Sequence, residues 1–200
     1  LLQFIHLHRL GFAILFDLAT GLRIGELCAL KWSDVNFNKQ TIKISRTLQR
    51  IKKSIGEKVS EGGNTAILEG NVKTNSGFRE IPVPDNVFSM LMQHKAIQEQ
   101  EKICYAGIYQ DNGYIFAMPM GTCVEPHTMR DALNYLLAAA GIEHANFHAL
   151  RHTFATRAIE NGVNVKTLSD ILGHSQVQIT MDLYCHTSLD LMRDSMNKLA

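Results

Sequence analysis

The densest run of side chains that could do chemistry is His148-Ala-Leu-Arg-His152. On a helix, residues three apart share a face, so the His148 imidazole and the Arg151 guanidinium can reach the same anion. His174 follows further along the chain, and Tyr184 comes ten residues after it, about one short helix away. A tyrosine hydroxyl has a pKa of about 10, so it needs nearby cations and a proton acceptor before it can attack at neutral pH. These residues offer both.

Two other interpretations of the histidines compete with this one: a metal site, and a structural histidine at a helix end whose hydrogen bonds are satisfied. His144, His148 and His152 are four residues apart, which is also the spacing of metal ligands on a helix. A metal site is the weaker interpretation, because no acidic general base lies within the repeat, as it does in HExxH, and no cysteine is near it. Tyr184 alone would be typical of an amphipathic residue at a helix end, with its hydroxyl in water. The scattered cysteines form no CxxC pair, which indicates reduced thiols. They are Cys28, Cys104, Cys123 and Cys185.

The charge of the chain is uneven along its length. Twenty Lys and Arg against nineteen Asp and Glu leave a net charge of +1, which gives no support for a nucleic-acid partner. From Lys39 to Lys58, however, there are seven basic residues and one acidic residue. This segment is either a solvated basic loop or a surface that contacts phosphates. Its candidate DNA contacts are Lys43, Arg46, Arg50, Lys52 and Lys53.

The N-terminal half predicts two helices and a small sheet. An apolar stripe from Ile5 to Leu18 predicts a helix that ends at Gly21, and a shorter helix is expected from Arg23 to Leu30. Alternating apolar residues then predict three strands of one antiparallel sheet, with a long loop from Ser54 to Gly63 between two of them. The strands carry Ile42, Ile44 and Leu48, then Ile67, then Ile81 and Val83.

The C-terminal half predicts helices throughout, so the expected fold class is α+β, mainly α-helical with one small antiparallel sheet. These helices span Asp85 to Cys104, Pro126 to Ala140, Leu150 to Glu160, Val165 to Leu172, Gln176 to Leu183 and Ser188 to Leu199. With 200 residues, of which 46% are hydrophobic, the chain can form one globular domain or a tightly joined pair. The longest apolar run, Leu10 to Phe16, is far shorter than the roughly 20 residues of a membrane-spanning helix. No signal peptide precedes it.

Four separated blocks resemble the tyrosine recombinases, also called phage-type integrases. Thr20 to Leu27, followed by Leu30 to Val35, is similar to the segment with the first catalytic arginine of that family. Val72 to Val83 resembles the β-hairpin with the catalytic lysine. The His148 to His152 run, Leu172-Gly-His174 and Tyr184 resemble the C-terminal signature. The blocks occur in the order of the family and cover nearly the whole chain.

The resemblance implies a role for each residue. Tyr184 would attack a DNA phosphodiester and form a 3′-phosphotyrosine with a free 5′-hydroxyl. Arg23, Arg151 and His174 would bind the non-bridging oxygens, where negative charge builds up in the transition state. Two further residues would move protons, and two would support the site. Lys73 would protonate the leaving oxygen, and His148 would transfer a proton at the nucleophile. His152 and Glu26 would support the site, and Glu26 would orient the structure around it.

The same resemblance implies a function and partners. The protein would be a metal- and ATP-independent site-specific DNA recombinase without cofactors, acting on double-stranded attachment sites, in style closest to integrases of conjugative transposons and integrative elements. It would be a monomer alone and a tetramer on DNA, without a membrane partner, in the bacterial cytoplasm. A type IB topoisomerase, which uses the same phosphotyrosine chemistry, and a catalytically silent DNA-binding module are the alternatives.

Domain organisation follows from the same comparison. Residues 1–186 would form the catalytic domain, and residues 187–200 a helix that packs on a neighbouring protomer or on its own core. The chain begins inside the expected first helix of that domain. We therefore expect the upstream core-binding and arm-binding domains of the family to be absent, and DNA binding by the chain to be weak.

Overall fold

The N-terminal segment contains a break where the sequence predicts one continuous helix. In the computed structural model, the 3₁₀ helix η1 (Leu2–Leu7) is followed by the helix α1 (Gly11–Thr20). His8 between them has an extended backbone, and its Nδ1 accepts a hydrogen bond from the Leu10 N–H at 3.0 Å. A Cβ at Gly11 would lie 1.8 Å from the Ile5 carbonyl oxygen, so only glycine fits this sharp entry into α1. Of the predicted apolar stripe, Leu10 and Ile14 are buried, whereas Ile5, Leu15 and Leu18 are only partly buried, and the periodicity gives no sign of the break.

The strands form two sheets rather than the single predicted sheet. They are β1 (Val35–Asn36), β2 (Thr41–Ile44), β3 (Arg46–Lys52), β4 (Thr65–Asn71) and β5 (Arg79–Pro82). One sheet has the order β1-β2-β5 and the other is the pair β3-β4, all antiparallel. Ile44 pairs with Arg79, whereas Arg46 pairs with Asn71, so the chain changes its partner at Ser45. Alternation correctly predicts that Ile42, Ile44 and Leu48 are buried, but it carries no information about the pairing partner.

The helices agree closely with those predicted from periodicity. They are α2 (Ile24–Ala29), α3 (Asp85–Cys104), α4 (Pro126–Ala139), α5 (His148–Glu160), α6 (Val165–Leu172) and α7 (Val177–Tyr184), with short 3₁₀ turns η2 (Trp32–Asp34) and η3 (Asn75–Gly77). Pro126 begins α4, where its missing N–H leaves no helix hydrogen bond unmade. Gly173 ends α6 in the left-handed conformation, with φ of 67°.

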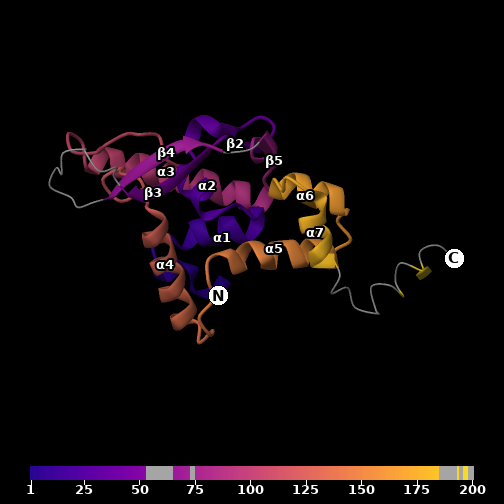
Figure 1. Cartoon of the computed structure of the whole chain (residues 1–200). Coiled ribbons are helices and arrows are strands. Elements are labelled where there is room, and N and C mark those ends of the chain that lie inside the picture. Colours follow the sequence, from indigo (N-terminus) through magenta and orange to yellow (C-terminus); the bar gives the residue numbers. More distant parts are fainter. Residues whose placement is uncertain (53–64, 73–74, 185–192, 194–195, 198–200) are drawn as a thin grey trace.

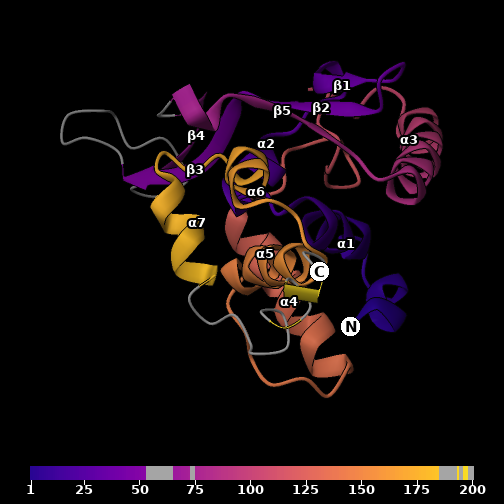
Figure 2. The same ribbon diagram turned by 90° about the vertical axis from the view of Figure 1, so that its right-hand side faces the viewer.

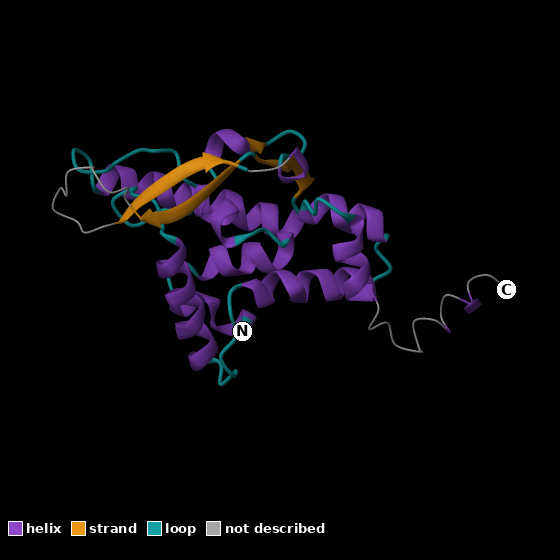
Figure 3. Cartoon of the chain, in the orientation of Figure 1, coloured by secondary structure: helices purple, strands orange, loops and turns teal. Residues whose placement is uncertain are grey.

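The strands lie together on one side of the molecule, and α1, α2 and α5 lie beneath them (Figures 1 and 3). In Figure 1, α4 lies at one end of this layer, and α6 and α7 lie at the other. Turned by 90°, the molecule shows α3 on one side and α7 on the opposite side (Figure 2). The main hydrophobic core joins the strands to α1–α5, and a smaller cluster between α5 and α6 contains Ala155, Ile159, Leu168 and Leu172.

The structure describes residues 1–52, 65–72, 75–184, 193 and 196–197. The predicted loop from Ser54 to Gly63 and most of the predicted helix from Ser188 to Leu199 lie outside these residues. Within the described part of the chain, no helix has the length and apolar character needed to cross a membrane.

Candidate active site

Arg23 lies at the N-terminal cap of α2, directly after the left-handed turn that ends α1. Its guanidinium donates hydrogen bonds to the Glu26 carboxylate at 2.8 Å and to the Gly173 carbonyl oxygen at 3.1 Å. Its backbone N–H also donates to Glu26 at 3.0 Å, which caps the first turn of the helix. The Arg23 side chain is 44% exposed, so part of this guanidinium remains open to an incoming anion.

Arg151, in the first turn of α5, is almost completely buried. Its guanidinium donates to the Gly21 carbonyl oxygen and to the Leu172 carbonyl oxygen, both at 2.7 Å. Burial, reinforced by the charge of Arg23, lowers the pKa of Arg151 to about 10. The side chain therefore stays charged at neutral pH and ties the end of α1 to the end of α6.

The two arginines and His174 meet at one point of the fold. Arg151 and Arg23 bind the consecutive carbonyl groups of Leu172 and Gly173, directly before His174. The His174 Nδ1 lies 2.8 Å from the hydroxyl oxygen of Thr180, which is buried in α7. Burial and the positive charges of Arg151 and Arg23 lower the pKa of His174 to about 4, so its imidazole is neutral at neutral pH. The structure thus gathers three of the predicted phosphate-binding residues into one cationic cluster.

His148 and His152 lie one turn apart on α5, with ring centroids 4.6 Å apart and ring planes at 88°. Burial lowers the pKa of His148, and the nearby His152 and Arg151 lower it further. His144 precedes α5 and therefore does not share the helix face on which the metal-site alternative depends. Among the residues that the structure describes, no group of three or more His, Cys, Asp and Glu side chains could hold a metal ion.

Arg79 is a residue of the site to which the sequence analysis gave no role. It is buried at the start of β5, and it donates to Glu26 at 2.8 Å, to the Ile171 carbonyl oxygen at 2.6 Å and to the Gly77 carbonyl oxygen at 3.1 Å. Burial opposes the ionisation of Glu26, but the hydrogen bond and charge of Arg79, together with Arg23, lower its pKa overall. Glu26 thus bridges two arginines, as a residue that orients structure would. An arginine in a strand position of an otherwise apolar alternation is the signal that could have pointed to Arg79.

Asp17 is the second missed residue. Its side chain is completely buried in α1, and neither carboxyl oxygen has a hydrogen-bond partner among the described residues. Burial raises the pKa of Asp17 well above its usual range, although the charge of Arg151 opposes this shift. An acidic residue that directly follows the longest apolar run was the sequence signal for this burial.

Two of the predicted catalytic side chains lie outside the part that the structure describes. Tyr184 is the last residue of α7, and its backbone is described but its side chain is not. Lys73, two residues beyond the end of β4, is not described. Their roles stay predictions.

The predicted DNA contacts on the basic segment already have partners within the protein. Arg46 forms an ion pair with Asp34, Arg50 forms one with Glu125, and the Lys43 ammonium lies 4.7 Å from the centre of the Phe78 ring. The backbone of Lys52 ends β3, but its side chain and all of Lys53 lie outside the described residues. A phosphate would have to compete for Arg46 and Arg50.

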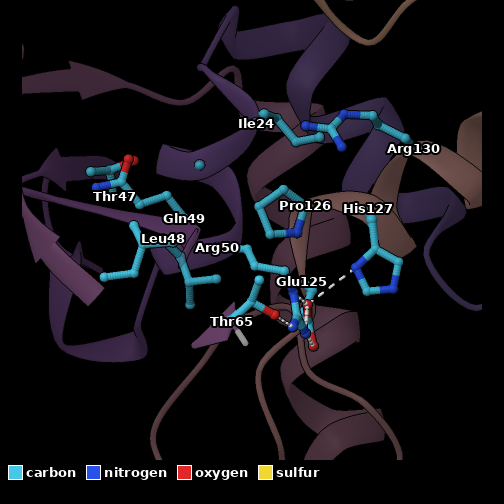
Figure 4. A pocket seen from close by; sticks show the side chains of 12 residues that line it. Ile24, Thr47, Leu48, Gln49, Arg50, Thr65, Glu125, Pro126, His127 and Arg130 are labelled. Atoms are coloured by element: carbon cyan, nitrogen blue, oxygen red, sulfur yellow. Dashed lines mark hydrogen bonds and ion pairs between the residues drawn. The ribbon is translucent and has the colours of Figure 1, made fainter. Parts of the chain in front are cut away.

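A groove of about 850 Å³ lies between the β3–β4 hairpin and the first turn of α4. Ile24, the residue after Arg23, lines this groove together with Arg50, Glu125, His127 and Arg130. Figure 4 shows the side chains of Arg50, Glu125 and His127 converging on one another. The groove thus begins next to the cationic cluster.

Comparison with known proteins identifies similar sequences over almost the whole chain. The phage integrase family matches residues 2–190. A tyrosine recombinase XerC-like protein of Caldanaerobacter subterraneus is 35% identical, over 90% of this chain and 46% of its own length. The transposase from transposon Tn916 of Enterococcus faecalis is 26% identical, over 93% of this chain and 44% of its own length. The chain thus spans about half the length of these curated relatives.

Solved structures of recombinases have a fold similar to that of this chain. The Tn1549 transposon integrase in complex with a circular intermediate DNA has a TM-score of 0.75 and 27% identity, over 100% of this chain and 62% of that chain. The XerA recombinase, at 24% identity, has a TM-score of 0.68 over 98% of this chain and 58% of that chain. The mainly helical architecture with small antiparallel sheets is therefore shared with recombinases.

Proposed function

The chain belongs to the phage integrase family, and on that premise we propose that it is the catalytic part of a site-specific DNA recombinase. The observation that carries this proposal is the convergence of Arg23 and Arg151 on the adjacent carbonyls of Leu172 and Gly173, directly before His174. Two fixed guanidinium charges beside a neutral imidazole suit a phosphodiester whose negative charge grows in the transition state. The DNA partner is supported by the similar Tn1549 integrase, which was solved with DNA.

In the proposed reaction, the Tyr184 hydroxyl oxygen attacks the phosphorus and the bond from phosphorus to the 5′-oxygen breaks. The products are a 3′-phosphotyrosine and a free 5′-hydroxyl. Arg23, Arg151 and His174 bind the non-bridging oxygens throughout this step. Lys73 gives a proton to the leaving 5′-oxygen.

His148 takes the proton of the tyrosine hydroxyl. Its pKa is lowered by burial and by the neighbouring His152 and Arg151, so its imidazole is neutral and can accept a proton at neutral pH. His174 acts differently. If the Thr180 hydroxyl donates to its Nδ1, then Nε2 carries the ring proton and can donate it to a phosphate oxygen.

This chemistry needs neither a metal ion nor a nucleotide. Guanidinium groups stay charged at neutral pH and neutralise the phosphate where a divalent cation would do so in other enzymes. The phosphotyrosine bond retains the energy of the broken phosphodiester, so a second 5′-hydroxyl can attack it and rejoin the strand. Rejoining to a different strand requires self-association on DNA, which is part of the proposal.

The test is covalent trapping of the protein, in its full natural length, on a library of nicked duplexes with randomised sequence. Cleavage next to the nick releases a short strand, so the DNA stays bound to the protein and migrates with it on a denaturing gel. We expect an adduct for the wild type and for Tyr135→Phe, which changes an exposed tyrosine on α4. We expect none for Tyr184→Phe. Absence of an adduct for the wild type would contradict the proposed activity.

A further inference from the structure

The groove between the β3–β4 hairpin and α4 has no part in the proposed catalytic chemistry, and its charges are unevenly paired. Arg130 lines it, is exposed, and has no ion pair or hydrogen bond from its side chain among the described residues. Arg50 lines the facing wall and is held by Glu125, with nitrogen-to-oxygen distances of 2.8 Å and 2.6 Å, and by the Thr65 hydroxyl at 2.6 Å. Glu125 is the acidic residue among those that line this groove.

We propose that this groove binds the backbone of the DNA next to the catalytic cluster, and that a DNA phosphate displaces Glu125 from Arg50. The inference rests on the proposed function, which supplies DNA as the occupant. It deepens that function by identifying Arg130 as a residue that contacts a DNA phosphate directly. It also identifies Glu125 as a residue that competes with the DNA phosphate for Arg50.

The position of the groove favours this occupant. Ile24 lines the groove and directly follows Arg23, so a strand whose phosphate lies at the cluster can continue into the groove. A Cβ at Gly25 would lie 2.5 Å from the Thr47 hydroxyl, so α2 and β3 are in close contact where both line the groove. A second hollow of about 330 Å³ shares Ile24 and Arg130 with the groove and extends to His148. The groove is therefore adjacent to a hollow that reaches His148.

The energetics make the exchange feasible. The Arg50 side chain is 42% exposed, and an ion pair with this much solvent contributes only about 0.2–1 kcal/mol. The Arg50 guanidinium can make the same two-point contact with a phosphate as it makes with a carboxylate. Glu125 keeps a polar partner after the exchange, because its carboxylate also lies 3.1 Å from the His127 Nδ1 (Figure 4).

The test measures the affinity of the protein for a duplex of arbitrary sequence by fluorescence anisotropy across a range of salt concentrations, since phosphate contacts do not depend on sequence. Arg130→Gln and Arg50→Gln should each weaken binding and flatten the slope of log K against log salt by about 0.9. Glu125→Gln should tighten binding about two- to fivefold, which corresponds to the loss of one exposed ion pair. In the Arg50→Gln background this gain should vanish.

Matched controls use the same substitutions on another surface. Arg157→Gln and Glu160→Gln change exposed residues in the last turn of α5, outside the groove, and should leave the salt slope unchanged. Weaker binding by Glu125→Gln would overturn the exchange, because it would make the ion pair a clamp that DNA binding needs. A gain that persists without Arg50 would also overturn it. Failure of the wild type to bind any duplex would instead contradict the proposed function.

Discussion

At the scale of single residues, the side chains proposed to bind phosphate also hold the fold together. Arg151 satisfies two buried carbonyl groups, and Arg23 satisfies a third while it pairs with Glu26. A buried acceptor that loses its donor costs about 1–3 kcal/mol. Removing either guanidinium therefore perturbs both stability and chemistry, and an alanine variant alone cannot separate the two.

Arg151→Lys separates them better than Arg151→Ala. Lysine keeps the positive charge but lacks the planar, forked guanidinium. It therefore cannot donate to the Gly21 carbonyl, the Leu172 carbonyl and a phosphate oxygen at the same time. We expect strand cleavage to fall at least about 100-fold, the size of effect seen when one transition-state donor is lost, while DNA binding stays within a few-fold. The measurements are single-turnover cleavage and binding of the same duplex. A parallel loss of both would indicate a structural role.

His174 gives a prediction about pH. Its pKa of about 4 in the folded protein lies below the value of about 6.5 expected in the unfolded chain. The unfolded chain therefore binds more protons between these values, so the stability that neutral His174 contributes is complete above about pH 6.5 and is lost as the pH falls toward 4. The free energies of unfolding of the wild type and His174→Gln should converge over this window. An NMR titration midpoint of the His174 ring near 6.5 in the DNA-free protein would contradict this account.

At the scale of elements, the turn from α6 to α7 is the point on which the site is built. Gly173 has a left-handed backbone, and its carbonyl accepts from Arg23. A Cβ at this position would lie 2.8 Å from both the Arg79 guanidinium and the Ser76 carbonyl oxygen. This turn therefore requires glycine for two reasons. Its backbone has a positive φ, and its close packing against η3 and β5 leaves no room for a side chain.

Gly173→Ala should therefore abolish cleavage, because the turn and His174 must shift away from Arg79 and Arg23. Gly162→Ala is the matched control, since Gly162 also has a positive φ, of 77°, but nothing lies within 4 Å of an added Cβ. We expect this control to lose about 1 kcal/mol of stability and to keep its activity. The comparison is a cleavage rate together with a thermal unfolding curve for each variant. Equal activity of the two alanine variants would contradict the proposed role of the turn.

The same elements show how far sequence reasoning reaches. Helices from α3 to α7 follow from apolar periodicity and from the Pro and Gly residues at their ends, because these signals are local. The division of the strands into two sheets depends on the pairing of β2 with β5 and of β3 with β4, and no local pattern encodes these partners. At Arg79 and Asp17 the local sequence signals indicate unusual burial but not the contacts, which are made with residues distant in sequence.

At the scale of the whole molecule, the net charge of +1 conceals how the charges are distributed. Within the basic segment, Arg46 and Arg50 are paired with acids from other elements, Asp34 and Glu125, whereas three arginines gather around the α6–α7 turn. The proposed phosphate-binding cluster is therefore small and set among carbonyl groups, and the family resemblance points to it where composition does not. The predicted division into residues 1–186 and 187–200 stays a prediction, as does the packing of the last helix.

The most direct measurement of the central claim is mass-spectrometric mapping of the DNA-bound residue. The trapped adduct is digested with nuclease and protease, and the peptide that carries a nucleotide remnant is sequenced. The chain has five tyrosines, and the hydroxyl of one of them, Tyr114, donates to Glu69 at 2.6 Å. We predict that the remnant lies on Tyr184 alone, at the end of the helix that follows His174. A remnant on any other residue would contradict the proposed mechanism.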